Sequence, residues 1–241
     1  ATSLYEPERQ VWKRGVPDRP EVCLTFDDGP HISCESLLDT LKARGVKATF
    51  FVVGNMVEKH PDQVRRMIAE GHEVGNHTYD HKRLNTLKPD QVHVELAACA
   101  DAVRRAAGVN MTFMRPPGMR LNDAVIAENR RFGYILMDWT IGAKDFIGNT
   151  PTHEIPPSLR DQPNATPELV RERVAKQLKN GAIILLHDNP VTAKALPGIL
   201  DDLAAKGYSV KSATEMMAEL PQRVNIVANP RLLTSAKESK R

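Results

Sequence analysis

The sequence predicts an α/β fold, a distorted barrel of about seven parallel strands surrounded by helices. Short β-rich runs alternate with amphipathic helical stretches from residue 21 to residue 220, and no Asn-Gly turn lies between two apolar runs. Such alternation is typical of a parallel sheet, in which a helix connects each strand to the next. Seven strand–helix units fit a barrel better than an open, doubly wound sheet, which is the alternative that the pattern leaves open.

The expected elements follow one another along the chain. The first strand, 21–26, is an apolar run that ends in two adjacent carboxylates and a Gly-Pro turn. In the longest helical stretch, 89–107, apolar residues recur on one face and Gly108 ends the helix. The expected strands are 21–26, 48–53, 72–76, 111–115, 133–139, 182–187 and 208–211. The expected helices, from their helical periodicity, are 34–44, 61–70, 89–107, 122–131, 166–179, 193–206 and 212–219.

The chain is expected to form one domain. With 241 residues, of which 41% are hydrophobic, it can bury one large core. We expect an N-terminal extension at 1–19, the barrel at 20–220 and a basic tail at 221–241. An irregular stretch, 147–165, contains four prolines; we expect a wall of a binding groove there, with a surface insertion as the alternative.

Charge and cysteine content narrow the possible functions only slightly. The net charge is +3 at pH 7, and nothing beyond this charge indicates a nucleic-acid partner, so none is expected. No apolar stretch approaches the length of about 18 residues that a transmembrane helix needs. The three cysteines, Cys23, Cys34 and Cys99, lack CxxC spacing and are expected to be small buried side chains, which leaves the cellular compartment open.

Two short segments carry the chemistry. Asp27 and Asp28 follow the first strand, and adjacent carboxylates repel each other unless a cation or an arginine relieves them. His77 and His81 have the i, i+4 spacing that brings two rings to one side of a helical turn. One carboxylate and two imidazoles would make a three-ligand divalent metal site with open positions, and the second carboxylate would be free to act as a base. The sequence therefore predicts a metal-dependent hydrolase.

Other polar and aromatic residues also lie at the ends of expected strands. Arg115 follows the fourth strand, Trp139 ends the fifth, and His187 follows the sixth. Active sites of parallel barrels assemble at the carboxyl ends of the strands. We therefore expect these residues to share one site with the two earlier segments.

Five segments, in order, resemble the motifs of polysaccharide deacetylases with the NodB homology domain, carbohydrate esterase family four. The resemblance covers about residues 20–220, and five motifs in order are far more specific than one. The first, second, third and fifth motifs are Thr25-Phe26-Asp27-Asp28, His77-Thr78-Tyr79-Asp80-His81, Arg115-Pro116-Pro117-Gly118 and Leu185-Leu186-His187-Asp188. The fold of the family, a distorted barrel of parallel strands, agrees with the alternation above.

The fourth motif of the family, Asp-x-x-Asp-Trp, is matched less closely. Asp138 and Trp139 offer one register, but Asp138 then falls at a strand position. Matching Trp139 to the tryptophan that ends the family's strand places the motif around Asp145 instead. We expect this second register, in which Gly142 replaces the first aspartate and Phe146 replaces tryptophan. An aromatic wall is then retained, but an indole N–H is lost.

The resemblance implies a role for each motif residue. Asp28, His77 and His81 would bind a metal that polarises the substrate carbonyl and activates water; zinc is expected, with cobalt, nickel or iron as alternatives. Asp27 would be the base, and Arg115 would pair with it.

The remaining motif residues would complete the reaction. His187 would be the acid that protonates the leaving amine, and Asp145 would hold its ring and raise its pKa. The backbone N–H of Gly118 would stabilise the oxyanion. Three residues are expected to contact the substrate, the first of them lining a pocket for the acetyl methyl group: Leu185, Phe146 and Trp139.

The implied function is hydrolysis of N-acetyl groups on a β-linked amino-sugar polymer or oligomer, chitin-type or peptidoglycan, by a secreted, periplasmic or cell-surface enzyme. An O-acetyl esterase acting on acetylated xylan is an alternative that the same metal and base would support. A non-catalytic carbohydrate-binding relative is a second alternative. It predicts loss of a ligand or of His187, and only Gly142 and Phe146 depart from the pattern in its favour. The oligomeric state is not indicated.

Overall fold

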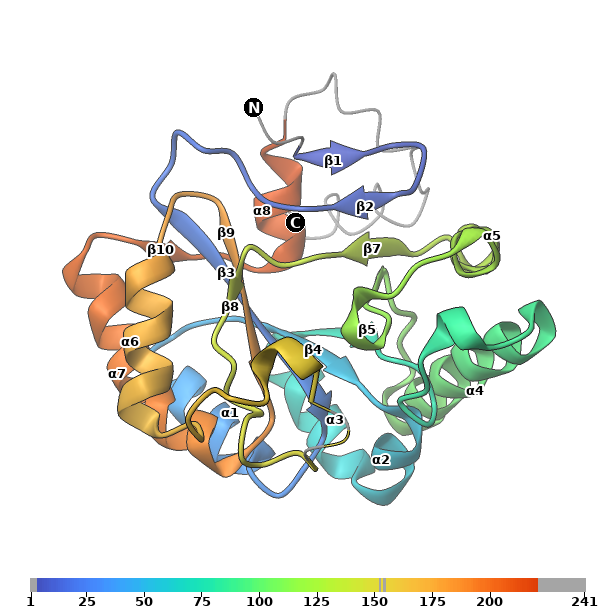
Figure 1. Ribbon diagram of the computed structural model, residues 1–241, viewed down its shortest axis with the longest axis horizontal. Helices are drawn as coiled ribbons and strands as arrows, with labels where there is room; N and C mark the ends of the chain where they lie inside the picture. Colours follow the sequence, from blue (N-terminus) through green and yellow to red (C-terminus); the bar gives the residue numbers. More distant parts are fainter. Residues whose placement is uncertain (1–3, 152, 154, 221–241) are drawn as a thin grey trace.

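A computed structural model describes residues 4–151, 153 and 155–220 of the chain (Figure 1). The expected C-terminal tail, 221–241, lies outside these residues. Each of the seven expected strands and seven expected helices has a counterpart, with ends that shift by at most three residues. Strands β1, β2 and β8 and helix α2 were not expected.

The strands are β1 (Tyr5–Glu6), β2 (Val11–Trp12), β3 (Glu21–Gly29), β4 (Thr49–Val52), β5 (Glu73–Asn76), β6 (Phe113–Met114), β7 (Ile135–Met137), β8 (Ile141–Gly142), β9 (Ala182–His187) and β10 (Ser209–Val210). The α-helices are α1 (Cys34–Ala43), α2 (Gly54–Lys59), α3 (Pro61–Ala69), α4 (Pro89–Ala107), α5 (Asp123–Phe132), α6 (Pro167–Gln177), α7 (Pro190–Ala205) and α8 (Ala213–Ala218). Short 3-10 helices are η1 (Leu84–Thr86), η2 (Pro117–Met119) and η3 (Pro157–Leu159).

One curled sheet organises the molecule, and helices α1 to α7 pack on its outer side (Figure 1). The buried residues of α8 instead join the cluster that contains Trp12 and Cys23. Its order is β1-β2-β7-β6-β5-β4-β3-β9-β8, with β10 beside the start of β3. All pairs are parallel except β1 with β2. Because β7 leads through three residues into β8, at the other end of the order, the sheet curls into a distorted half-barrel. The predicted fold class is confirmed.

An antiparallel pair lies at the N-terminus, within the expected extension 1–19 and before the range in which parallel strands were expected. In β1 and β2, Tyr5 pairs with Trp12, and β2 continues the sheet in parallel beside β7. Trp12 is fully buried, and its ring centroid lies 6.0 Å from that of Phe113. Two-residue strands are too short to show a period of two, so the sequence pattern could not reveal them.

Alternation along the strands decides which side chains face the inside of the curled sheet. On β3, Leu24 and Phe26 join the cluster between sheet and helices, whereas Cys23 joins the interior cluster. Asp27 has the same parity as Cys23, so it too faces inward, at the carboxyl end of the strand. On β9, Ile183 belongs to the interior cluster, and His187 follows it at the same parity. The pleat therefore places the side chains of Asp27 and His187 at the same end of the barrel interior.

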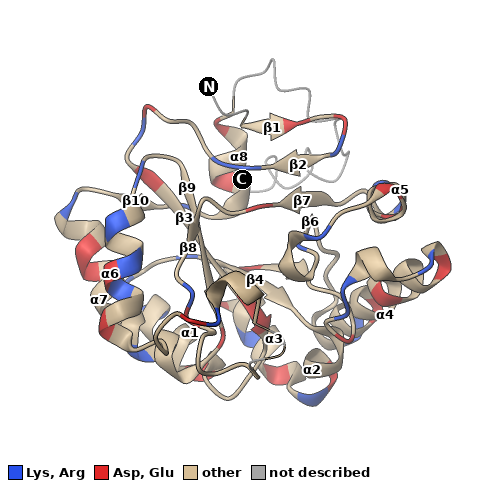
Figure 2. Cartoon of the chain, in the orientation of Figure 1, with Lys and Arg blue, Asp and Glu red and all other residues tan. Residues whose placement is uncertain are grey.

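The surface and the cysteines agree with the sequence-based expectations. All three cysteines are buried and free. Acidic and basic residues both lie on the outer helices, for example on α4 and α6 (Figure 2), and many are paired, such as Arg171 with Asp202 at 2.6 Å. Among the described residues, no helix combines the length and hydropathy needed to cross a bilayer.

Candidate active site

Asp27 and His187 lie side by side at the ends of adjacent strands. They are register partners in the parallel pair of β3 with β9, and the Asp188 backbone N–H donates to the Asp27 carbonyl at 3.0 Å. Asp27 is 3% exposed, so its carboxylate lies in the barrel mouth rather than in bulk solvent. A carboxylate and an imidazole are thereby placed on neighbouring strands.

A bulge brings the second carboxylate to the same side. In a regular strand Asp27 and Asp28 would point to opposite faces, but the register of β3 against β4 shifts between Asp27 and Gly29. Asp28 has a φ of 71°, a conformation that costs a non-glycine residue free energy and is common at functional sites. As a result, Nε2 of His77 lies 3.8 Å from Asp27 Oδ2 and 3.2 Å from Asp28 Oδ1.

The two histidines occupy a loop and not the helical turn that their spacing suggested. His77 directly follows β5, and the next helical residues are those of η1, beginning at Leu84. Thr78 and His81 have φ values of 69° and 56°, so two left-handed residues fold the chain back. The ring centroids of His77 and His81 are nevertheless 5.0 Å apart, and His81 Nε2 lies 3.2 Å from Asp28 Oδ1. The expected proximity is present, but its backbone explanation was wrong.

The chemistry of this cluster fits a divalent cation. One ligand atom each from Asp28, His77 and His81 lie within 4.8 Å of one another. His77 Nδ1 is 2.6 Å from the carbonyl oxygen of Arg115, which can only accept, so Nδ1 carries a proton and Nε2 is the atom that faces Asp28. Asp28 Oδ1 is buried and has no hydrogen-bond partner. Burial alone would raise the pKa of Asp28. The two imidazoles outweigh this effect, and the pKa of Asp28 lies well below its ordinary value.

Arg115 fills the barrel interior and neutralises Asp27. Its side chain is fully buried, and Nη1 donates to Asp27 Oδ1 at 2.7 Å and to Thr25 Oγ1 at 2.8 Å. Nε donates to the Met137 carbonyl at 2.8 Å, at the end of β7. The guanidinium carbon lies 4.2 Å from the ring centroid of Phe51. The planar fork thus joins β3 to β7, which a lysine could not do.

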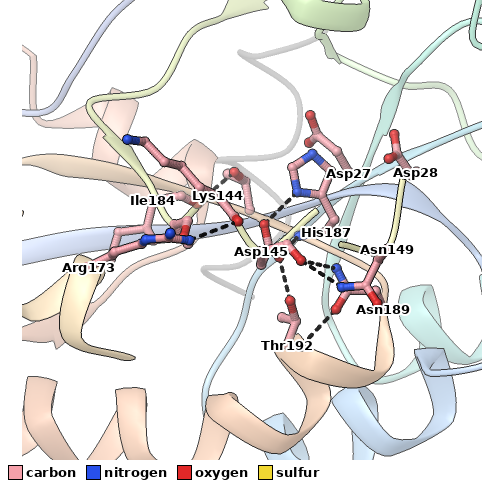
Figure 3. Close-up of polar contacts among 12 residues, drawn as sticks. Asp27, Asp28, Lys144, Asp145, Asn149, Arg173, Ile184, His187, Asn189 and Thr192 are labelled. Carbon is pink, nitrogen blue, oxygen red and sulfur yellow. Dashed lines mark hydrogen bonds and ion pairs between the residues drawn. The ribbon is translucent and has the colours of Figure 1, made fainter. Parts of the chain in front are cut away.

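Asp145 holds His187 from below (Figure 3). Its Oδ1 lies 2.8 Å from His187 Nδ1, and its Oδ2 accepts the His187 backbone N–H at 2.7 Å and the hydroxyl of Thr192. The carboxylate is fully buried. Burial lowers the pKa of His187, but the charge and hydrogen bond of Asp145, with the charges of Asp28 and Asp27, raise it to about 10. Asp138, the alternative in the other register, instead accepts the neighbouring Trp139 backbone N–H at 2.8 Å.

The comparisons with known proteins decide the family. The polysaccharide deacetylase family model matches residues 14–137. The chain belongs to the polysaccharide deacetylase family. Chitin deacetylase of Colletotrichum lindemuthianum is 32% identical over 213 residues, which cover 83% of this chain and 81% of that protein. Peptidoglycan-N-acetylglucosamine deacetylase PgdA of Listeria monocytogenes is 34% identical over 212 residues, which cover 85% of this chain but only 41% of that protein.

One similar solved structure bears on whether a polysaccharide deacetylase domain must be active. A CE4 family pseudoenzyme from Bacillus anthracis superposes with a TM-score of 0.76 at 27% identity, covering 87% of this chain and 69% of that one. The fold is therefore shared with a protein described as a pseudoenzyme. Activity of this polysaccharide deacetylase family member has to be argued from its own residues.

Two of the expected substrate-contacting residues, Phe146 and Trp139, lie beside His187 and Arg115 of the polysaccharide deacetylase barrel. Phe146 lies edge-on to His187, with ring centroids 5.3 Å apart. Trp139 is half-buried, and its ring centroid lies 5.7 Å from the Arg115 guanidinium carbon. Leu185 is 8% exposed on β9, and Gly118 is exposed with a φ of 64°. Their roles remain expectations.

Two buried polar residues of the site were missed from the sequence, and Asp188 of the fifth motif is also buried. Glu95 and Thr192 bond the histidine loop and Asp145, respectively. Asp188 is 5% exposed and accepts the His31 backbone N–H at 2.8 Å. Burial raises the pKa of Asp188 to about 6, the His31 N–H lowers it, and the charge of Asp28 raises it. For Glu95 a signal was present, because an acidic residue interrupts the apolar face of 89–107.

Proposed function

We propose that this chain removes N-acetyl groups from a β-linked amino-sugar polymer or oligomer of the chitin or peptidoglycan type. The observation that carries the proposal is the pairing of Asp27 with His187 at the strand ends, each held by its own buried partner beside the Asp28, His77 and His81 cluster. A base on one strand and an acid on the next suit a reaction in which water loses a proton and an amine gains one.

Asp27 is the base in this proposal. Its Oδ1 lies 2.7 Å from Nη1 of Arg115, which holds in place the carboxylate that would accept a proton from water. Its distance of 3.8 Å from His77 Nε2, against 3.2 Å for Asp28, leaves Asp28 as the better ligand. Adjacent aspartates then have different tasks.

His187 is the acid. An amine leaves poorly as an anion, so amide hydrolysis needs a protonated group near the leaving nitrogen. The buried Asp145 carboxylate accepts from His187 Nδ1, which leaves Nε2 as the proton-donating atom. The raised pKa keeps His187 protonated at neutral pH.

Asp28, His77 and His81 would hold a divalent cation, for which zinc is the proposed metal and cobalt the alternative. When bound, such a cation polarises the substrate carbonyl and lowers the pKa of water. The Gly118 N–H, three residues beyond Arg115, is the proposed donor to the oxyanion. Leu185, Phe146 and Trp139 are the proposed contacts of the acetyl group and the sugar.

The substrate class rests on the relatives, which are named as chitin and peptidoglycan deacetylases. Such polymers lie outside the cytoplasmic membrane, and we therefore propose a secreted, periplasmic or cell-surface location. The shared fold of a pseudoenzyme makes a carbohydrate-binding role the second candidate. Retention of Asp27, Asp28, His77, His81 and His187 favours the enzyme.

Release of acetate from defined substrates tests the proposal. Chitooligosaccharides, peptidoglycan fragments and acetylated xylan are each incubated with zinc-loaded and metal-stripped protein, and mass loss is followed by mass spectrometry. We expect loss of acetyl groups from the amino sugars with loaded protein only. Loss from xylan alone would instead show an O-acetyl esterase, and binding without loss from any substrate would show the carbohydrate-binding relative.

A further inference from the structure

The loop that carries His77 and His81 is held from the side of α4 by a buried glutamate. Glu95 is 4% exposed, and its Oε2 accepts the backbone N–H groups of Tyr79 and Asp80 at 3.0 Å and 2.9 Å. Its other oxygen, Oε1, lies 2.7 Å from Lys82 Nζ. One carboxylate therefore bonds two consecutive amides and a lysine of the same loop.

The buried position of Glu95 is energetically unfavourable for a carboxylate. It lies on the face of α4 that also carries the buried residues Val92, Leu96 and Cys99, and an ionised carboxylate in apolar surroundings is unfavourable unless donors compensate it. Its three donors all come from residues 79–82, between and just beyond the two histidines. Packing of α4 alone would be served better by an apolar residue.

The other side of the loop is held by α2. The Gly54 N–H donates to the Thr78 carbonyl at 2.9 Å, and the Asn55 N–H donates to the Tyr79 carbonyl at 3.0 Å. A Cβ added at Gly54 would lie 2.5 Å from Tyr79 Cδ2, so the loop sits directly against this helix. The loop's carbonyl groups thus accept from the backbone of α2, and its amides donate to the Glu95 side chain of α4. Together these bonds fix the backbone between the two histidines.

The need for such support differs between the two histidines. His77 is buried, and its Nδ1 bonds to the Arg115 carbonyl. The His81 side chain is 46% exposed, and its backbone has a left-handed φ of 56°. The position of its ring therefore depends chiefly on the path of the backbone from residue 78 to residue 81.

We propose that Glu95 is a positioning residue for the metal centre, which fixes His81 relative to His77 and Asp28 through the amides of Tyr79 and Asp80. This inference rests on the metal site of the proposed function. Groups that orient metal ligands typically change metal affinity by about 10- to 100-fold when removed. Glu95 touches none of the three candidate ligand side chains and acts through the backbone.

Metal titration of the full chain tests this role without any substrate. The metal-free parent and the variants Glu95→Ala, Glu95→Gln and Glu128→Ala are titrated with Zn²⁺ in competition with a chelator, and their Co²⁺ absorption spectra are recorded. Glu128 is the matched control, because it is 5% exposed and bonds His93 of α4 and Arg131 of its own helix, α5, but no residue of the histidine loop.

We expect Glu95→Ala to weaken Zn²⁺ binding about 10- to 100-fold and to alter the Co²⁺ spectrum. Glu95→Gln keeps an acceptor for the amides but not the charge, so it should give an intermediate loss. Glu128→Ala should bind Zn²⁺ like the parent even if its melting temperature falls.

The role of Glu95 would be overturned if Glu95→Gln bound Zn²⁺ as tightly as the parent, or if Glu128→Ala lost as much affinity as Glu95→Ala. The glutamine variant also decides the matter if alanine prevents folding. Failure of the parent to bind Zn²⁺ would overturn both the positioning role and the metal site.

Discussion

Asp27 and His187 are register partners on two parallel strands, and each makes a short hydrogen bond to a different buried group of opposite charge. Arg115 holds the first and Asp145 the second. Because register fixes the pair, the sheet sets the distance between the proposed base and the proposed acid, whereas the two partners set the charge beside each of them. Changes in a partner should therefore alter proton transfer while the sheet remains intact.

Removal of the metal should abolish activity. Chelation should stop acetate release and added zinc should restore it, since one ligand atom each from Asp28, His77 and His81 lie within 4.8 Å of one another. His77→Ala should lower metal content, measured by elemental mass spectrometry. His93→Ala, which removes an imidazole bonded to Glu128, is the control and should retain the metal. Full turnover by a metal-free sample would contradict the assignment.

Asp27→Asn should separate the base from the ligands. This variant should keep its metal, because Asp28 Oδ1 lies closer to His77 Nε2 than Asp27 does. Its kcat should fall about 10²- to 10⁴-fold, as expected when a general base is lost. Metal content and kcat are measured on the same sample. A variant that loses the metal would show that the roles of the two aspartates are exchanged.

Asp145→Asn should impair amide hydrolysis selectively. The charge of Asp145 is the main influence that raises the pKa of His187 to about 10 against the effect of burial, so the pKa should fall in this variant. The alkaline limb of the pH–rate profile should move to lower pH, and an N-acetyl substrate should lose more rate than an activated acetate ester, which needs little protonation. Asp138→Asn, which removes the charge of the side chain that accepts the Trp139 N–H, should alter stability more than the amide-to-ester ratio. If Asp138→Asn showed the selective amide defect and Asp145→Asn did not, the fourth motif would instead lie at Asp138 and Trp139.

Asp188→Asn should change how stability depends on pH. The folded-state pKa of about 6 lies above the ordinary 3.8, so folding favours the protonated acid, and its contribution is lost as pH rises from about 4 to about 6. The melting temperature of the metal-free parent should therefore fall relative to that of metal-free Asp188→Asn across this interval. The His31 N–H retains an acceptor in the variant. A constant difference between the two melting temperatures would show that Asp188 does not titrate there.

The sequence predicted the positions of the strand ends better than the backbone conformation of the loops that follow them. The strand 182–187 was expected with the bounds that β9 has, because an unbroken apolar run marks a buried parallel strand. The bulge at Asp28 and the left-handed residues at Thr78 and His81 were not foreseen, since none of these three is a glycine.

Side-chain contacts in the interior could also not be predicted from local sequence patterns. The bonds of Thr192 to Asp145 and of Glu95 to the histidine loop join residues that are 47 and up to 16 positions apart. Spacing reveals which residue types can meet on one element, but these pairs depend on how α7 and α4 pack against the sheet. The contact of Asp145 with His187 was expected from the resemblance and could not have been derived from spacing.

The place of β3 in the sheet has a consequence for how the chain folds. β3 lies between β4, which follows it closely in the chain, and β9, which comes near the end. The candidate metal ligands belong to the ends of β3 and β5, joined through β4, whereas His187 arrives only with β9. Contacts between distant parts of a chain form late, and an unpaired strand edge favours aggregation. During synthesis, the ligand cluster would be complete before its acid, and β3 would have an open edge until β9 emerges.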